Sequence, residues 1–153
     1  MVILDTDVIL LAFAFQRDSR QPVNTAFLAQ AQSKGIAITI YSLMEILGQL
    51  SFNLSADKLK AWQSWLVDAY SLTVIWPVDP ENATASISFR TEIFERPLER
   101  MLTKRAAFMD ALILNLAERT PGAEMFVTWN ARHFKEKSAL KVLTPQEFLE
   151  QSQ

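Results

Sequence analysis

Three acidic side chains stand beside apolar segments in distant parts of the sequence: Asp5, Glu45 and Asp110. Clustered carboxylates repel one another and are costly to bury. A bound divalent cation removes both costs, and carboxylate oxygens favour Mg²⁺ or Mn²⁺. A water on such a metal can act as a nucleophile while the metal stabilises charge on a phosphate. If the three carboxylates converge, they predict a metal-dependent hydrolysis of phosphodiesters.

The elements that would bring these residues together alternate along the chain. Short apolar segments typical of buried strands cover residues 2–4, 36–40, 72–76, 125–128 and 141–143. Segments with the apolar spacing of helices cover residues 24–34 and 106–119, and others begin near residues 42, 55, 79 and 144. This alternation predicts a three-layer α/β/α fold with a mostly parallel sheet of four to five strands.

Parallel strands end at one edge of a sheet, and folds of this class bind their ligands there. Asp5 directly follows the first expected strand, Glu45 lies one turn into the helix after the second, and Asn130 follows the fourth. Asp110 lies near the start of the helix that leads back to the fourth strand, so it belongs near the same edge. We therefore expect all of these side chains to converge.

Several of these residues also have structural interpretations. Ser42 and Glu45 match the S-x-x-E capping box, so Glu45 is either a helix-capping residue or a ligand. Asp7 is either a further site residue or a helix N-cap. Asn130 is also a common turn residue, and His133, the only histidine, is expected to be structural.

Four segments together resemble the motifs of PIN domains. VILDTDVILL is similar to their opening motif, an apolar strand that ends in Asp-Thr/Ser-x. SLMEILGQL resembles the second motif, a helix with a Glu, and FMDALILNLAE resembles the third, an Asp followed by an apolar helix. FVTWNARHF resembles the fourth, a strand and a Thr followed by a polar residue. The order and spacing match from Val2 to the final LTPQEFL.

This resemblance implies a metal-dependent endoribonuclease whose cofactor is Mg²⁺ or Mn²⁺. Asp5, Glu45 and Asp110 would be the metal ligands and, with Asn130, the catalytic residues. Thr6 would help to hold a ligand or a water, and Ser42 is similar to a small polar residue often found near that site. Many small bacterial members are VapC-type toxins of toxin–antitoxin pairs, so the resemblance also implies an antitoxin partner and a homodimer.

Asn130 is the one departure from the family pattern, because this position is often Asp in PIN domains. An Asn can supply a neutral carbonyl oxygen or a hydrogen bond to water, but it adds no negative charge. The substitution should weaken a second metal site. We therefore expect a site that holds a single metal ion.

The net charge of −2 does not favour broad electrostatic attraction to nucleic acid, so RNA binding would need a local basic surface. Residues 90–105 are the one basic-leaning stretch, although glutamates interleave with its arginines. The stretch is either a solvated helix surface with ion pairs or a contact for RNA. Lys104 and Arg105, which lie shortly before Asp110, are the candidates for binding RNA phosphates.

The bulk properties predict a single cytoplasmic domain over residues 1–153. There is no cysteine, which excludes a disulfide scaffold, a thiolate zinc site and a cysteine nucleophile. No uncharged run approaches the roughly 18 apolar residues that a membrane span needs. No basic segment precedes the apolar opening, so we expect neither a signal peptide nor a membrane partner.

Two other functions compete with the ribonuclease. The segment from Leu4 to Val8 also matches the Asp-x-Asp opening of haloacid-dehalogenase-like phosphatases, with Asp5 as nucleophile and Asp7 as acid and base. That family needs a late acidic pair, and Asp110 is the only aspartate after residue 79. The second alternative is a degenerate PIN domain that binds RNA or a protein without cleavage, as Asn130 would allow.

Overall fold

The computed structural model describes residues 1–77 and 90–151, and within them five parallel strands form one sheet. The strand order is β3-β2-β1-β4-β5, so the first strand lies at the centre. The strands are β1 (Val2–Leu4), β2 (Ile36–Thr39), β3 (Thr73–Ile75), β4 (Met125–Val127) and β5 (Lys141–Leu143). All the neighbouring pairs run parallel, which places the carboxyl ends of the strands along one edge.

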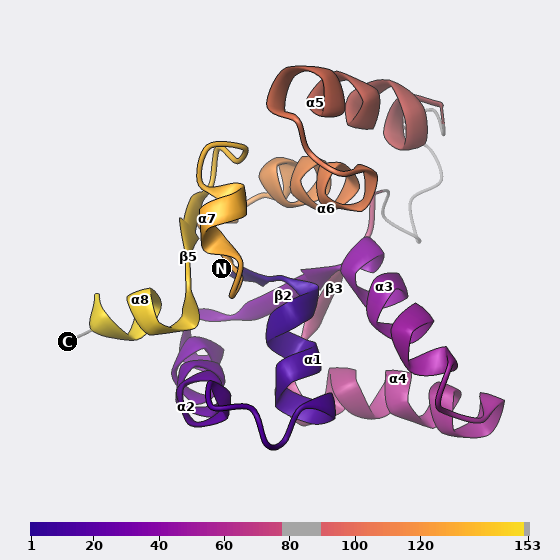
Figure 1. Cartoon of the computed structure of the whole chain (residues 1–153), viewed down its shortest axis with the longest axis vertical. Coiled ribbons are helices and arrows are strands. Elements are labelled where there is room, and N and C mark those ends of the chain that lie inside the picture. The colour runs from indigo at the N-terminus through magenta and orange to yellow at the C-terminus, as the bar shows by residue number, and fades with distance from the viewer. Residues whose placement is uncertain (78–89, 152–153) are drawn as a thin grey trace.

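Helices cover both faces of this sheet (Figure 1). They are α1 (Thr6–Ala14), α2 (Gln21–Ala31), η1 (Gln32–Lys34), α3 (Ile40–Ser51), α4 (Ala56–Tyr70), η2 (Thr91–Glu95), α5 (Arg96–Lys104), α6 (Phe108–Arg119), α7 (Ala131–Phe134) and α8 (Pro145–Glu150). The three-layer α/β/α architecture with a parallel sheet, which the sequence predicts, is confirmed.

Two apolar cores lie on opposite faces of the sheet because successive side chains of a strand point in opposite directions. Val2 and Leu4 of β1 pack with buried residues of α1, α2, α4 and α8. Ile3, between them in the sequence, packs on the other face with α6 and α7. The central strand is therefore buried on both faces, which explains its continuous apolar sequence.

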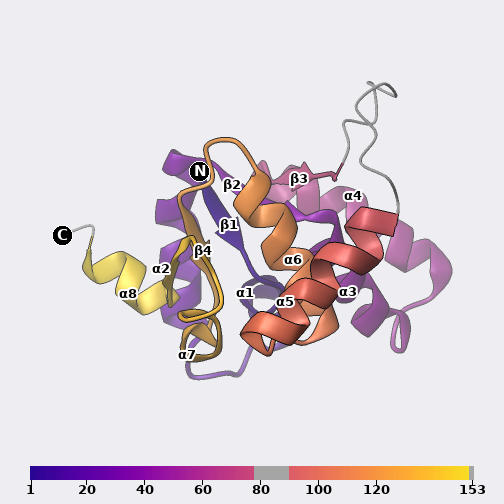
Figure 2. The ribbon, with the colours of Figure 1, turned by 90° about the horizontal axis from the view of Figure 1, so that it is seen from above.

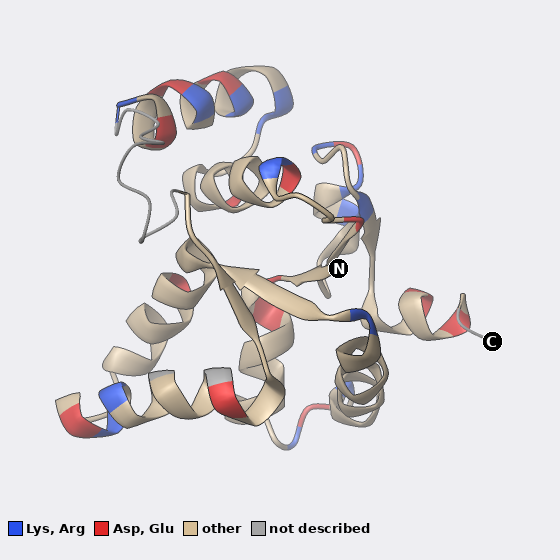
Figure 3. Cartoon of the chain, turned by 180° about the vertical axis from the view of Figure 1, so that it is seen from behind, with Lys and Arg blue, Asp and Glu red and all other residues tan. Residues whose placement is uncertain are grey.

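The short helix α5 lies on the outer side of α6 and not directly on the sheet (Figures 1 and 2). It ends at Arg105, whose φ of 53° puts this arginine in the left-handed region. Both signs of charge follow one another along α5 (Figure 3), as the interleaved residues of the sequence predict.

Some local expectations were wrong. The second strand ends at Thr39, and Ile40 already belongs to α3. The Thr39 hydroxyl accepts the Ser42 N–H and caps this helix, so the predicted capping box of Ser42 and Glu45 does not form. The helix start expected near residue 144 is confirmed, and Thr144 and Glu147 form a capping box there.

Other expectations were incomplete. Helices α1 and α7 were not predicted, and the helix expected from residue 106 begins at Phe108. The helix start expected near residue 79 lies outside the described residues. Within residues 1–77 and 90–151, no helix is both long and apolar enough to cross a membrane.

The core between α6 and the sheet should dominate stability. Leu114 is fully buried in this core, whereas Leu102 on α5 is 70% exposed. We expect Leu114→Ala to lower the free energy of unfolding by about 2–5 kcal/mol, because it removes packed atoms and leaves a cavity. Leu102→Ala is the matched control and should change it by less than about 0.5 kcal/mol. Urea denaturation followed by circular dichroism measures both, and equal losses would contradict the assignment of this core.

Candidate functional site

A pocket of about 300 Å³ lies at the carboxyl edge of the sheet, and we call it the acid pocket. Its walls include the four residues that the sequence suggests for catalysis: Asp5, Glu45, Asp110 and Asn130. The remaining lining residues are Thr6, Asp7, Leu10, Gln49 and Phe134. The predicted convergence of these distant residues is therefore present in the structure.

Asp5 is placed by the end of the central strand. Its backbone N–H donates to the carbonyl of Val127 at 2.9 Å, which continues the pairing of β1 with β4 by one residue. Its side chain then caps α1, because Oδ1 accepts the Thr6 N–H at 2.8 Å. Asp5 thus ends a buried strand and begins a helix, which fixes a buried carboxylate at the edge of the sheet.

Glu45 reaches the same pocket from α3. Its Oε2 accepts a hydrogen bond from the Thr6 hydroxyl at 2.6 Å. Because Thr39 caps the helix, the carboxylate of Glu45 is not used for capping. Thr6 therefore orients a candidate ligand, as the sequence suggests, and it does so by joining α1 to α3.

Asp110 lies in the first turn of α6, where its Oδ2 is 3.1 Å from Nε2 of His133 on α7. His133 was expected to be structural, and this contact was not predicted. The two residues are separated by 23 positions, and no local pattern signals such a pairing. The contact ties α7 to the acid pocket.

Asp7 holds the loop that carries Asn130. Its Oδ2 accepts from the Thr128 hydroxyl at 3.1 Å, and its Oδ1 accepts from the Trp129 N–H at 3.2 Å. The Asn130 N–H in turn donates to the Thr128 hydroxyl at 3.0 Å. Asp7 is therefore not the N-cap of α1, which is Asp5, and its carboxylate positions the loop after β4.

Three of the suggested substrate-binding residues lie outside the acid pocket. Ser42 is buried inside α3, where its hydroxyl is 3.0 Å from that of Thr39, so it supports the start of the helix. Lys104 and Arg105 are exposed at the end of α5 and do not line the acid pocket. Gln49, one helical turn after Glu45, does line it, and no sequence pattern pointed to this residue.

The acid pocket carries an excess of negative charge, because four carboxyl groups line it and Arg20, outside the lining, attracts only Asp7 among them. Burial and the nearby carboxylate of Asp7 raise the pKa of Asp5 to about 7, with a smaller contribution from Glu45. The nearby Thr128 hydroxyl and the hydrogen bond from the Thr6 N–H only partly oppose this rise. Burial also raises the pKa of Asp7. Among the described residues that line the pocket there is no lysine or arginine to neutralise these groups.

The oxygen donors of this pocket suit a hard cation such as Mg²⁺ or Mn²⁺. Their present directions are less favourable, since within residues 1–77 and 90–151 no three His, Cys, Asp or Glu side chains are arranged to hold a metal ion. Glu45 is turned to Thr6, and Asp110 is turned to His133. A shared metal would require these two carboxylates to shift, or to bind it through the oxygens that Thr6 and His133 leave free.

Comparisons with known proteins give a match in fold. No protein-family model matches the sequence, and no curated protein matches it. A FitAcB structure from Neisseria gonorrhoeae superposes with a TM-score of 0.62 at 15% sequence identity, covering 95% of this chain and 99% of that one. A structure of FitAB bound to an IR36 DNA fragment gives a TM-score of 0.59 at 16% identity, covering 95% of each chain.

A third solved structure, VapBC2 from Rickettsia felis bound to a DNA fragment from their promoter, has a TM-score of 0.60. It is 20% identical, and the match covers 94% of this chain and 98% of that one. The likeness extends over nearly the whole of each chain, so the folds correspond as complete units. At these identities the likeness establishes the fold, and any activity must be argued from the acid pocket.

The charge of the acid pocket predicts how stability depends on pH when divalent cations are chelated. The pKa of Asp5 rises from about 3.9 in an unfolded chain to about 7 in the folded protein. A carboxyl with a raised folded pKa loses stability as the pH increases between these values. Asp5→Asn removes this loss and keeps a good N-cap. We expect the variant to be more stable than the wild type at about pH 8, with a smaller gain near about pH 5.

Urea denaturation in a chelating buffer measures this difference. Asp57→Asn is the matched control because Asp57 is exposed on α4, and it should give no gain that depends on pH. The same gain at both pH values would show that the buried charge of Asp5 is not the cause.

Proposed function

We propose that this protein is a metal-dependent endoribonuclease that hydrolyses phosphodiester bonds of RNA in the acid pocket. The observation that carries this proposal is the convergence of Asp5, Glu45, Asp110 and Asn130 at the carboxyl edge of the sheet. The excess negative charge of the carboxylates favours a bound cation, and a phosphodiester is a substrate on which such a cation acts.

Asp5, Glu45 and Asp110 would hold one Mg²⁺ or Mn²⁺ ion. When bound, the metal supplies a water of lowered pKa and stabilises negative charge on the phosphate. Asp5 is the fixed member of the set, since its backbone and its helix cap determine its position. Thr6 and His133 orient Glu45 and Asp110, respectively.

Asn130 supplies a neutral amide to the same pocket, held by the loop that Asp7 and Thr128 fix. A neutral group here supports one metal ion better than two, because a second divalent cation would lack a charged ligand. The role of Asn130 is therefore to orient a water or a phosphate oxygen by hydrogen bonding.

We further propose that the protein is the toxin of a toxin–antitoxin pair and forms a homodimer in the cytoplasm. Similar folds occur in FitAB and VapBC2, and both were solved with a DNA fragment. Large apolar side chains remain exposed on this chain at Phe15, Phe52 and Phe94. Such side chains suit contact with a small antitoxin protein and with a second copy.

Two alternatives are less well supported by the geometry. A phosphatase of the haloacid-dehalogenase type would need Asp7 as a free acid and base, but both oxygens of this carboxylate accept bonds from the loop after β4. A domain that binds RNA or a protein without cleavage is favoured by Asn130 and by the present directions of Glu45 and Asp110. The cleavage assay below separates this alternative from the enzyme.

The ribonuclease is tested with purified protein, RNA and either Mg²⁺ or Mn²⁺. We expect cleavage that a chelator stops. The value of kcat/KM should fall by more than about 100-fold in Asp5→Asn, Glu45→Gln or Asp110→Asn, because each substitution removes a charged ligand. Thr6→Val should lower it by about 10- to 100-fold, since it only frees Glu45. Asp57→Asn is the control and should cleave as the wild type does. Cleavage that survives in Asp5→Asn would contradict the assignment, and RNA binding without any cleavage would favour the binding domain.

The toxin assignment is tested by growth. Expression of the wild-type protein alone should slow bacterial growth, because uncontrolled cleavage of RNA stops protein synthesis. Asp5→Ala should restore growth at equal protein level, as measured by optical density and immunoblot. Co-expression of the protein encoded by the neighbouring reading frame should also restore it. Equal inhibition of growth by the Asp5→Ala protein would contradict the toxin assignment.

A further inference from the structure

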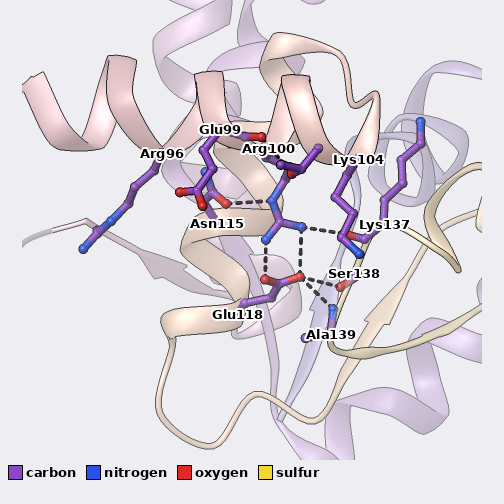
Figure 4. A pocket seen from close by; sticks show the side chains of 10 residues that line it. Arg96, Glu99, Arg100, Lys104, Asn115, Glu118, Lys137, Ser138 and Ala139 are labelled. Carbon is purple, nitrogen blue, oxygen red and sulfur yellow. Dashed lines mark hydrogen bonds and ion pairs between the residues drawn. The ribbon is translucent and has the colours of Figure 1, made fainter.

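A second polar pocket, of about 340 Å³, lies between α5, α6 and the loop after α7 (Figure 4). We call it the basic pocket because Arg96, Arg100, Lys104 and Lys137 line it, against the carboxylates of Glu99 and Glu118. The arginines and Lys104 come from α5, whereas Lys137 follows α7. Such a concentration of cations is notable in a protein whose net charge is −2.

Arg100 and Glu118 form the inner wall of the basic pocket and neutralise each other. The Arg100 guanidinium also donates to Asn115 Oδ1 at 2.7 Å and to the carbonyl of Lys137 at 2.6 Å. Glu118 accepts further bonds from Ser138 and from the Ala139 N–H. Burial alone would raise the pKa of Glu118, but these bonds outweigh burial and lower it. The pair therefore stays ionised and fixes the loop of residues 137–139.

Lys104 and Lys137 supply the charge that remains for a ligand. Arg96 pairs with Glu92 at 3.4 Å, outside the lining of the basic pocket. In the part of the chain that the structure describes, the Lys104 ammonium forms no hydrogen bond or ion pair. Glu99 offsets one of the two lysine charges, so the free groups of the pocket keep an excess of positive charge.

Lys137 also connects the basic pocket to the acid pocket. Its Nζ donates to the carbonyl of Arg105 at 3.1 Å and lies 2.9 Å from Nε2 of His133. The same Nε2 is 3.1 Å from Oδ2 of Asp110. A ring nitrogen either donates or accepts in the ring plane, so Nε2 cannot bind both partners at once. When Nε2 of His133 donates to Asp110, the Lys137 ammonium keeps the Arg105 carbonyl and lies 3.4 Å from Nδ1, and its third N–H can meet another acceptor.

We propose that the basic pocket binds a backbone phosphate of the substrate RNA, next to the phosphodiester that enters the acid pocket. Lys104 and Lys137 contact this phosphate, and His133 lies between the two subsites. The inference rests on the proposed ribonuclease function for the identity of the ligand. Its physical reason is that the acid pocket repels a polyanion, so a strand needs a cationic anchor within reach.

The test is the binding of a fluorescently labelled single-stranded RNA to the full-length protein in a chelating buffer, where no cleavage occurs. Fluorescence anisotropy over a range of salt concentrations gives the affinity and its salt dependence. We expect the Lys104→Ala, Lys137→Ala double variant to bind about tenfold more weakly. The slope of log affinity against log salt should shrink by roughly 0.7 for the lost phosphate contact.

Lys60→Ala is the matched control, since Lys60 is an exposed lysine of α4 that lines neither pocket. It should bind RNA with the affinity and the salt slope of the wild type. Lys104→Ala alone guards against misfolding of the double variant, because Lys104 has no partner to lose among the described residues. We expect this single variant to bind more weakly than the wild type.

Wild-type affinity and salt slope in Lys104→Ala and in the folded double variant would overturn the proposal, even if the wild-type protein cleaves RNA. An equal loss in Lys60→Ala would overturn it as well, because the effect would then reflect overall charge. Binding that depends on the two lysines in a protein that cleaves no RNA would support the phosphate subsite and refute the proposed ribonuclease.

Discussion

The buried carboxylate of Asp5 at the end of the central strand is the constraint on which the acid pocket depends. Pairing of β1 with β4 continues to the backbone of Asp5, and its side chain must then cap α1. The side chain cannot turn to solvent without releasing that cap. Burial raises the pKa of Asp5 to about 7, with further contributions from the nearby carboxylates of Asp7 and Glu45. The cluster of negative charge thus lowers the stability of the fold, and a bound cation would restore that stability.

Neutral donors hold the other carboxylates of the cluster. Thr6 donates to Glu45, and Thr128 donates to Asp7. A hydroxyl orients a carboxylate without cancelling its charge, whereas a lysine or arginine would neutralise it. These two hydroxyls also join α1 to α3 and to the loop after β4. The arrangement keeps the acid pocket both positioned and negative, which is the state that a metal-binding site requires.

The sequence predicts the outline of this site because strand order determines which residues share an edge. Asp5 follows β1 directly and Asn130 lies three residues after the end of β4, so their placement needs little more than a parallel sheet. The cap of α3 was misplaced because Thr39 looks like a strand residue and Ser42 looks like a cap. Helix α1 was missed because its run from Val8 is apolar on all sides, which hides a helical period. The contact of His133 with Asp110 depends on tertiary packing alone.

The acid pocket and the basic pocket are suited to ligands of opposite charge. A cluster that attracts a divalent cation also repels the polyanion on which that cation acts. The basic pocket places Lys104 and Lys137 nearby, while the Arg100–Glu118 pair keeps the Lys137 loop in position. His133 lies between the two pockets and can satisfy only one neighbour with Nε2. The residue that His133 bonds therefore affects two things at once. One is the orientation of the Asp110 carboxylate, a candidate metal ligand, and the other is the availability of the Lys137 ammonium, a candidate phosphate contact.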